Sequence, residues 1–139
     1  MKFYSILFIF QIVFLSDQFQ SYSLGSWEEI TFKECRDVLN LCISDANILL
    51  TTEANYFKLN KLERAQRHLV NGFMYKFQFS LVETKCLKSV SLSDGKLDVC
   101  ELSDKKNTVY CEASILEQKW LSPSTKMIKK PKCTSVPDF

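Results

Sequence analysis

A strictly alternating apolar segment behind a two-residue turn signal constrains this chain most. Large apolar side chains occupy every second position from 73 to 81, and Asn71-Gly72 stands directly before them. Such alternation indicates a strand with one buried face, and Asn-Gly supplies the positive φ values that both central residues of a tight hairpin turn need. The sequence therefore predicts a β-hairpin. Its tip presents His68, Leu69, Val70, Asn71 and Gly72 outward. A partner surface would cover the apolar side chains of Leu69 and Val70.

The first 23 residues are typical of a secretory signal peptide. Lys2 precedes an apolar core that is too short to span a bilayer comfortably. Small residues at the −1 and −3 positions suit cleavage after Ser23, and cleavage near Ser16 is the alternative. We expect residues 24–139 to form one soluble domain of 139 − 23 = 116 residues. No second apolar stretch reaches membrane length, so we expect no membrane partner.

The charge balance argues against a nucleic-acid partner. The chain has 18 basic and 16 acidic residues, a net charge of +2. A nucleic-acid binder usually concentrates a strong basic excess on one face. One basic run is present, formed by Lys126, Lys129, Lys130 and Lys132. We interpret it as a solvated strand and tail, with a polyanion site as the alternative.

Six cysteines, at positions 35, 42, 86, 100, 111 and 133, predict disulfides in a secreted chain. None of them forms a C-x-x-C pair, and the only histidine, His68, lies far from any cysteine in sequence. We therefore expect no metal site and no cofactor. His68 also has no nucleophile and base grouped around it, so an enzyme ranks third among the functional hypotheses.

Apolar residues between Ser26 and about Thr51 fall on one stripe of an α-helix. They are Cys35, Val38, Leu39, Cys42, Ala46 and Leu49. Ser26, with two glutamates behind it, suits the N-terminal start of this helix. Cys35 and Cys42 would lie two turns apart, about 10 Å along the axis. Disulfides need Cα atoms within about 7 Å, so a continuous helix keeps these two cysteines from bonding each other.

Four strands are expected after the helix. They cover Tyr56–Val70, which a bulge can interrupt, then Phe73–Cys86, Asn107–Lys119 and Ser124–Lys130. A loop over 91–96, with a turn at Asp94-Gly95, precedes the third strand, and residues 119–123 join the last two strands in a second hairpin. One helix followed by four antiparallel strands is an α+β layout. Both hairpin tips are expected at the same end of the sheet.

The hairpin tips and the segment before the helix resemble the cystatin family, specifically its secreted two-disulfide branch with insect and tick relatives. Family members carry a glycine near the N-terminus, a first hairpin loop written Q-x-V-x-G and a second loop containing Pro-Trp. The counterparts here are Gly25, His68-Leu69-Val70-Asn71-Gly72 and Lys119-Trp120. The resemblance covers the whole mature chain. It implies one long α-helix packed across a four- to five-stranded antiparallel β-sheet.

The resemblance also implies a function: a secreted, reversible, competitive inhibitor of papain-like cysteine proteases of the cathepsin type. The N-terminal segment and both hairpin tips would enter the active-site cleft on either side of the catalytic thiol, without presenting a bond for cleavage. Apolar side chains would lose water there, and glycines would let the backbone approach closely. We expect the protein to be a monomer. The expected protease-binding residues are Leu24, Gly25, His68, Leu69, Val70, Asn71, Gly72, Lys119 and Trp120.

Two of these positions depart from the family pattern. His68 stands where Gln is usual, and Lys119 stands where Pro is usual. An imidazole can still donate and accept hydrogen bonds, but it can also become charged in an acidic compartment. These departures permit a second hypothesis, a secreted cystatin-fold binding or toxin-like protein that has lost inhibition. Structural interpretations also stay open: Trp120 as a residue packed on the sheet, and Asn71-Gly72 as a turn only.

The order of the last four cysteines in the family implies the pairs Cys86–Cys100 and Cys111–Cys133. Cys35 and Cys42 lie outside that pattern, and we interpret them as buried free thiols. A third bridge is the alternative. Asn55, expected in the connection after the helix, lies near the place where some cystatins carry an asparagine that engages legumain. Ordinary turn chemistry is the alternative there.

Overall fold

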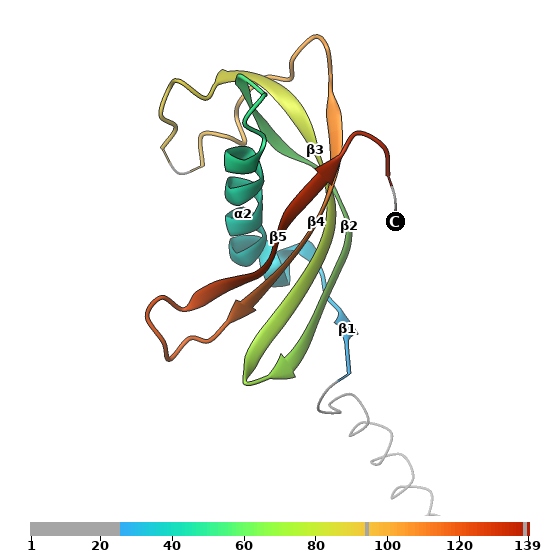
Figure 1. The fold of residues 1–139 in the computed structure, drawn as a ribbon, viewed down its shortest axis with the longest axis vertical. Helices are drawn as coiled ribbons and strands as arrows, with labels where there is room; N and C mark the ends of the chain where they lie inside the picture. The colour runs from blue at the N-terminus through green and yellow to red at the C-terminus, as the bar shows by residue number, and fades with distance from the viewer. Residues whose placement is uncertain (1–25, 94, 138) are drawn as a thin grey trace, which may run out of the picture.

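The computed structural model describes residues 26–93, 95–137 and 139. The predicted signal peptide, Leu24, Gly25 and the expected turn residue Asp94 lie outside the described residues. One helix, α2 (Phe32–Leu49), lies across one face of a five-stranded antiparallel sheet (Figure 1). The strands, in sheet order and in chain order, are β1 (Glu28–Glu29), β2 (Asn55–Val70), β3 (Gly72–Leu87), β4 (Thr108–Glu117) and β5 (Thr125–Thr134). The predicted α+β fold is confirmed.

The predicted helix start at Ser26 is wrong. Helix α2 begins at Phe32, and the backbone N–H of its N-cap, Thr31, donates a hydrogen bond to the Glu34 carboxylate at 2.8 Å. The two glutamates expected in the first helical turn form β1 instead. They do so because β2 offers them both backbone partners and basic side chains, whereas a first turn offers only the helix dipole.

The buried face of α2 follows the predicted stripe over most of its length. Its members alternate in steps of three and one: Cys35, Val38, Leu39, Cys42, Ile43, Ala46 and Asn47. Leu49 was also expected on this face but is 46% exposed. Over the last two turns the buried face includes Ile43 and Asn47, and Leu49 lies outside it. The Asn47 amide is bonded to Phe57 of β2, accepting from its N–H and donating to its C=O, both at 2.8 Å.

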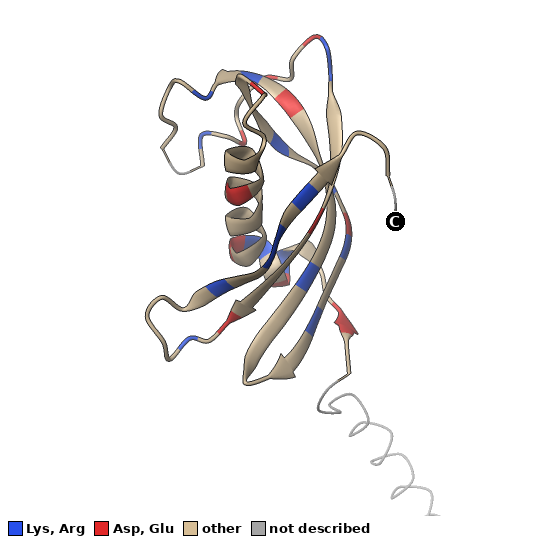
Figure 2. Cartoon of the chain, in the orientation of Figure 1, with Lys and Arg blue, Asp and Glu red and all other residues tan. Residues whose placement is uncertain are grey.

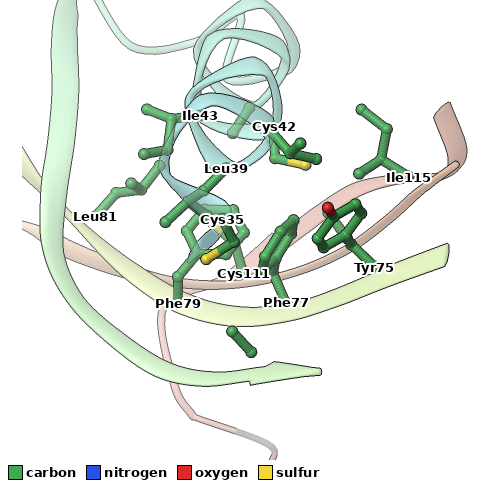
Figure 3. Packing of buried hydrophobic residues seen from close by; sticks show 14 of the residues in the cluster. Cys35, Leu39, Cys42, Ile43, Tyr75, Phe77, Phe79, Leu81, Cys111 and Ile115 are labelled. Carbon is green, nitrogen blue, oxygen red and sulfur yellow. The ribbon is translucent and has the colours of Figure 1, made fainter. Parts of the chain in front are cut away.

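The hydrophobic core lies between α2 and the sheet (Figure 3). Phe77, Phe79 and Leu81 of β3 are fully buried beneath the helix, which confirms the alternation that predicted this strand. Cys35 and Cys42 point into the same core as free thiols, as expected. Burial raises the pKa of Cys42 to about 12, so this thiol stays protonated at neutral pH.

The first hairpin forms as predicted, but its turn does not. Val70 pairs with Gly72, so Asn71 alone spans the turn. Gly72 has a φ of +118°. Among non-glycine residues in the described part of the chain, only Lys106 has a positive φ, so the φ of Asn71 is not positive. The expectation of positive φ at both turn residues is therefore wrong for Asn71. β2 does contain the predicted irregularities, with register shifts near residues 55–64.

Both predicted disulfides are present, and both lie at the end of the sheet away from the first hairpin tip. Cys86 is bonded to Cys100 with a Cα separation of 5.9 Å, and Cys111 is bonded to Cys133 at 4.1 Å. The second pair explains why β5 runs to Thr134 rather than ending at Lys130, because Cys133 stands opposite Cys111 in the register. We refer to this region as the disulfide end.

Asn55 has a structural role at the disulfide end. It was expected in the connection after the helix, but it is the first residue of β2. Its side-chain amide donates a hydrogen bond to the Thr84 carbonyl oxygen at 2.8 Å. Nearby, the Lys58 ammonium donates to the Cys100 carbonyl oxygen at 2.6 Å. These contacts tie β2 to β3 and to the segment after it.

Candidate functional site

The two hairpin tips lie at the same end of the sheet, as predicted. The register pairs Phe73 with Glu117 and Glu117 with Thr125, which places both turns just beyond one edge of the paired region. The two tips also contact each other, because the Gln118 side chain donates a hydrogen bond to the Asn71 carbonyl oxygen at 2.6 Å. With β1, they form the lower end of the molecule in Figure 1. We call residues 26–29, 69–72 and 118–124 the tip end.

The first tip exposes two apolar side chains and buries its glycine. Leu69 and Val70 are 47% and 44% exposed, as the sequence predicted. Gly72 was expected to face outward, but it is buried. A Cβ atom at this position would collide with the Glu117 carbonyl oxygen and lie 2.8 Å from Cγ of Gln118. Gly72 is thus needed for the packing of one tip against the other.

The second tip places its tryptophan in solvent. The Leu121 N–H donates to the Gln118 carbonyl oxygen at 3.0 Å, which makes Lys119 and Trp120 the central residues of a turn. Trp120 is 63% exposed and Leu121 is 49% exposed. The interpretation of Trp120 as a residue packed on the sheet is therefore wrong. Lys119 occupies the turn position at which proline is favoured, and the turn forms without the proline ring.

Strand β1 brings the N-terminal part of the described chain to the same end. Glu28 pairs with Arg67 and Glu29 with Gln66 in the register. The Glu28 and Glu29 carboxylates also lie 2.7 Å from the guanidinium groups of Arg67 and Arg64, and Figure 2 shows this acidic strand beside basic positions of β2. The chain that precedes Ser26 therefore starts from the tip end. Sequence reasoning missed β1, because a strand of two residues has no readable period.

His68 does not project freely from the first hairpin. Its ring lies against Trp27, with ring centroids 4.0 Å apart, and the side chain is half-buried. Its Nδ1 atom is buried without a hydrogen-bond partner among the described residues. The expectation that His68 is presented outward is wrong, because Trp27 covers it. Trp27 and Gln118 are the residues of this site that sequence reasoning did not find, since both act through contacts between distant segments.

Arg67 gives the first hairpin a fixed positive charge below its tip, and Tyr75 lies beside it as a neutral phenol. The Arg67 guanidinium donates to Glu28 and lies 4.8 Å from the centre of the Phe73 ring. Burial lowers the pKa of Arg67, but its hydrogen bonds, first to Glu28, leave the pKa raised overall. Burial raises the pKa of Tyr75, and the charge of Glu117 adds to this effect. Both groups therefore keep their protons at neutral pH.

The described part of the chain offers no cluster of three His, Cys, Asp or Glu side chains that could hold a metal ion. Within that same part, no helix has the length and apolar character needed to cross a membrane. What the site presents is a rim of exposed apolar side chains on two mutually bonded turns, with backbone close to the surface. Such a rim is suited to docking rather than to bond-making chemistry.

Comparison with known proteins identifies the family. The model of the cystatin domain matches residues 25–120, which include β1, the helix and both hairpin turns up to Trp120. The chain belongs to the cystatin family. A cystatin of Bitis arietans is 30% identical over 78 residues, which cover 53% of this chain and 69% of the other. The recognition of a cystatin from the sequence is confirmed.

Solved structures of other cystatins share the fold of this chain. Dimeric human cystatin F has a TM-score of 0.63 at 19% identity, covering 84% of this chain and 91% of the other. A salivary cystatin from the soft tick Ornithodoros moubata has a TM-score of 0.61 at 18% identity, covering 81% and 99%. At these identities the likeness establishes the fold, and it agrees with the predicted single helix on an antiparallel sheet.

Proposed function

We propose that this protein is a secreted, reversible, competitive inhibitor of papain-like cysteine proteases. The observation that carries the proposal is the junction of the tips, at which Gln118 is bonded to Asn71 while Val70 and Trp120 remain exposed on either side. A rim of this kind can fill a cleft and lose water along its length without offering a strained or extended bond for cleavage. Family membership supports this assignment.

The proposed contacts come from three segments. The first is Leu24-Gly25, which precedes the described chain. The second is the first tip, where Leu69 and Val70 provide apolar surface and Asn71 and Gly72 provide backbone. The third is Lys119-Trp120, at the centre of the second turn. His68 is the weakest member of the set, because Trp27 covers part of its ring.

We also propose that the protein is exported and that residues 1–23 are its signal peptide. Two disulfides support this proposal, because such bonds persist in oxidising compartments and are rare in the cytosol. Intact mass and N-terminal sequencing of protein from a eukaryotic secretory host would test it. A mature chain that begins at Leu24 is the expected result, and retention of Met1 in secreted material would contradict it.

Titration of the oxidised, processed protein against papain and a cathepsin tests the inhibitory function. We expect competitive inhibition that Trp120→Ala weakens by about tenfold or more, as for exposed aromatic anchors at other interfaces. Val70→Ala should weaken it by a smaller factor. Val99→Ala is the matched control, because Val99 is 78% exposed but lies at the disulfide end. Absence of inhibition by the wild-type protein at micromolar concentration would reject the proposal.

One alternative remains, a secreted cystatin-fold binding protein without inhibitory activity. It is favoured by Lys119, which places a charged side chain at the centre of the second tip, and by the covered position of His68. The two functions are distinguished by the same titration. A folded protein with both disulfides and a cooperative unfolding transition, yet no effect on either protease, would select the alternative.

A further inference from the structure

Trp27, just before β1, packs on the outer face of the sheet against side chains of β2 and β3. The pairing of Glu28 with Arg67 places Trp27 across from His68, and their rings are in contact at 4.0 Å between centroids. The Lys76 ammonium of β3 lies 4.2 Å from the centre of the same tryptophan ring. The side chain therefore starts from the chain just before β1, covers a residue of β2 and reaches β3.

The remaining contacts of β1 are weaker constraints. The Glu29–Arg64 ion pair is exposed on both sides, at 59% and 54%, and exposed ion pairs contribute little. The Glu28–Arg67 pair is better covered, with Arg67 23% exposed, but it holds the chain one residue beyond Trp27. The Ile30 N–H donates to the Ala65 carbonyl oxygen at 3.0 Å, which fixes the end of β1 nearer the helix. An aromatic contact combined with a cation over the ring is the stronger restraint at the N-terminal end of the strand.

The environment of His68 supports the same assignment. Its Nδ1 atom is buried without a partner among the described residues, which costs free energy that a longer, flexible amide could avoid. The compensating gain at this position is the tilted ring contact with Trp27, at an interplanar angle of 42°. The histidine therefore holds the tryptophan, and only the uncovered part of its ring remains to meet a partner protein.

We infer that Trp27 is a positioning residue for the N-terminal segment: its contacts with His68 and Lys76 set where the chain before Ser26 leaves the fold, beside the first hairpin tip. Two peptide units separate Trp27 from Gly25, a reach of about 7 Å, so the position of Trp27 limits how far from the first hairpin tip Gly25 can lie. This inference rests on the proposed function, because the effect on inhibition passes through Leu24 and Gly25.

A cycle of variants isolates this role. Inhibition of papain is measured for the mature chain, for a chain that starts at Ser26, and for Trp27→Ala in both. We expect Trp27→Ala to weaken inhibition about tenfold in the mature chain and to have no further effect in the shortened one. Trp27→Phe, which keeps a ring over His68, should restore most of the loss. Equal weakening in both chains would overturn the inference, because Trp27 would then act directly.

Trp120→Ala is the control for that cycle. Trp120 lies at the second tip and is proposed to touch the protease itself, so its removal should weaken inhibition by the same factor in the mature and shortened chains. A loss that also disappeared on shortening would show that the shortened chain no longer engages the protease cleft in the same way. The inference would then fail, because the lack of any effect of Trp27→Ala in the shortened chain would no longer point to the N-terminal segment.

A measurement without protease separates this inference from the proposed function. Backbone ¹⁵N relaxation reports the order of the Ser26 and Glu28 amides in the free protein. We expect Trp27→Ala and Lys76→Met to increase the mobility of these two amides, while Trp27→Phe leaves it close to wild type. Unchanged mobility of these amides in Trp27→Ala would overturn the inference, even if the wild-type protein inhibits papain as proposed. Increased mobility in a protein that inhibits no protease would reject the proposed function alone.

Discussion

The two ends of the sheet are held together by different kinds of interaction. At the disulfide end, Cys86–Cys100 joins β3 to the segment after it, and Cys111–Cys133 joins β4 to β5. At the tip end, the described contacts are noncovalent: the Gln118 to Asn71 hydrogen bond and the packing of Gly72 on Glu117. The difference suggests that stability is set mainly at one end and the shape of the contact surface at the other.

Removal of the Cys111–Cys133 disulfide should have the largest effect on stability. The bond joins residues 22 positions apart in sequence, and closing a loop of that size is worth about 3 kcal/mol in the chain-entropy model. We expect Cys111→Ala with Cys133→Ala to lower the free energy of unfolding by about that amount, as measured by guanidinium titration. Inhibition of papain by the folded variant should be unchanged. A parallel loss of inhibition would show that the two ends are not independent.

Gly72→Ala should have the next largest effect, and at the opposite end. The positive φ of 118° and the collision with Glu117 both oppose a side chain, so we expect a loss of about 2 kcal/mol together with weaker inhibition. Gly95→Ala is the matched control, because Gly95 has a φ of +82° and open space around it. Its cost should be about 1 kcal/mol, without any change in inhibition. Equal costs for the two variants, from urea unfolding, would contradict the packing of the tips.

Gln118→Ala should have the smallest effect. It removes the side chain that bonds one tip to the other at 2.6 Å, and a partly exposed hydrogen bond of this kind is worth about 1 kcal/mol. We expect inhibition to weaken by about fivefold and the free energy of unfolding to fall by about 1 kcal/mol. Gln78→Ala, which removes a 3.2 Å hydrogen bond to Glu112 in the middle of the sheet, is the control. A larger loss of inhibition from Gln78→Ala would remove the reason to treat the tip contact as special.

The parts of the fold that the sequence predicted have short, repeated signals. Alternation from Phe73 to Leu81 fixed β3 and its buried face, and the shared position of both tips followed from the antiparallel order. The disulfide pairs came from family resemblance, and the structure confirms them. The exposed state of Leu69 and Val70 could also be predicted, because they break the polar pattern expected of a hairpin tip.

The parts that could not be predicted depend on contacts between segments far apart in the chain. Glu28 and Glu29 look like a first helical turn until Arg67 and Arg64 are placed beside them. The burial of Gly72 depends on where the end of β4 lies, and the covered position of His68 depends on Trp27. In each case a local pattern allowed two interpretations, and a partner roughly 35 to 45 residues away decided between them.

The bond between Asn47 and Phe57 has a consequence for how the helix responds to mutation. The amide of Asn47 satisfies the N–H and the C=O of one residue at once, in the manner of an adjacent strand. If α2 slid or rotated by one position, the backbone N–H and C=O of Phe57 would lose their partner in the protein interior, where an unpaired amide group is costly. Asn47 therefore restrains both the height and the rotation of the helix above the sheet, together with Lys88, whose ammonium donates to the Asn47 and Leu50 carbonyl oxygens.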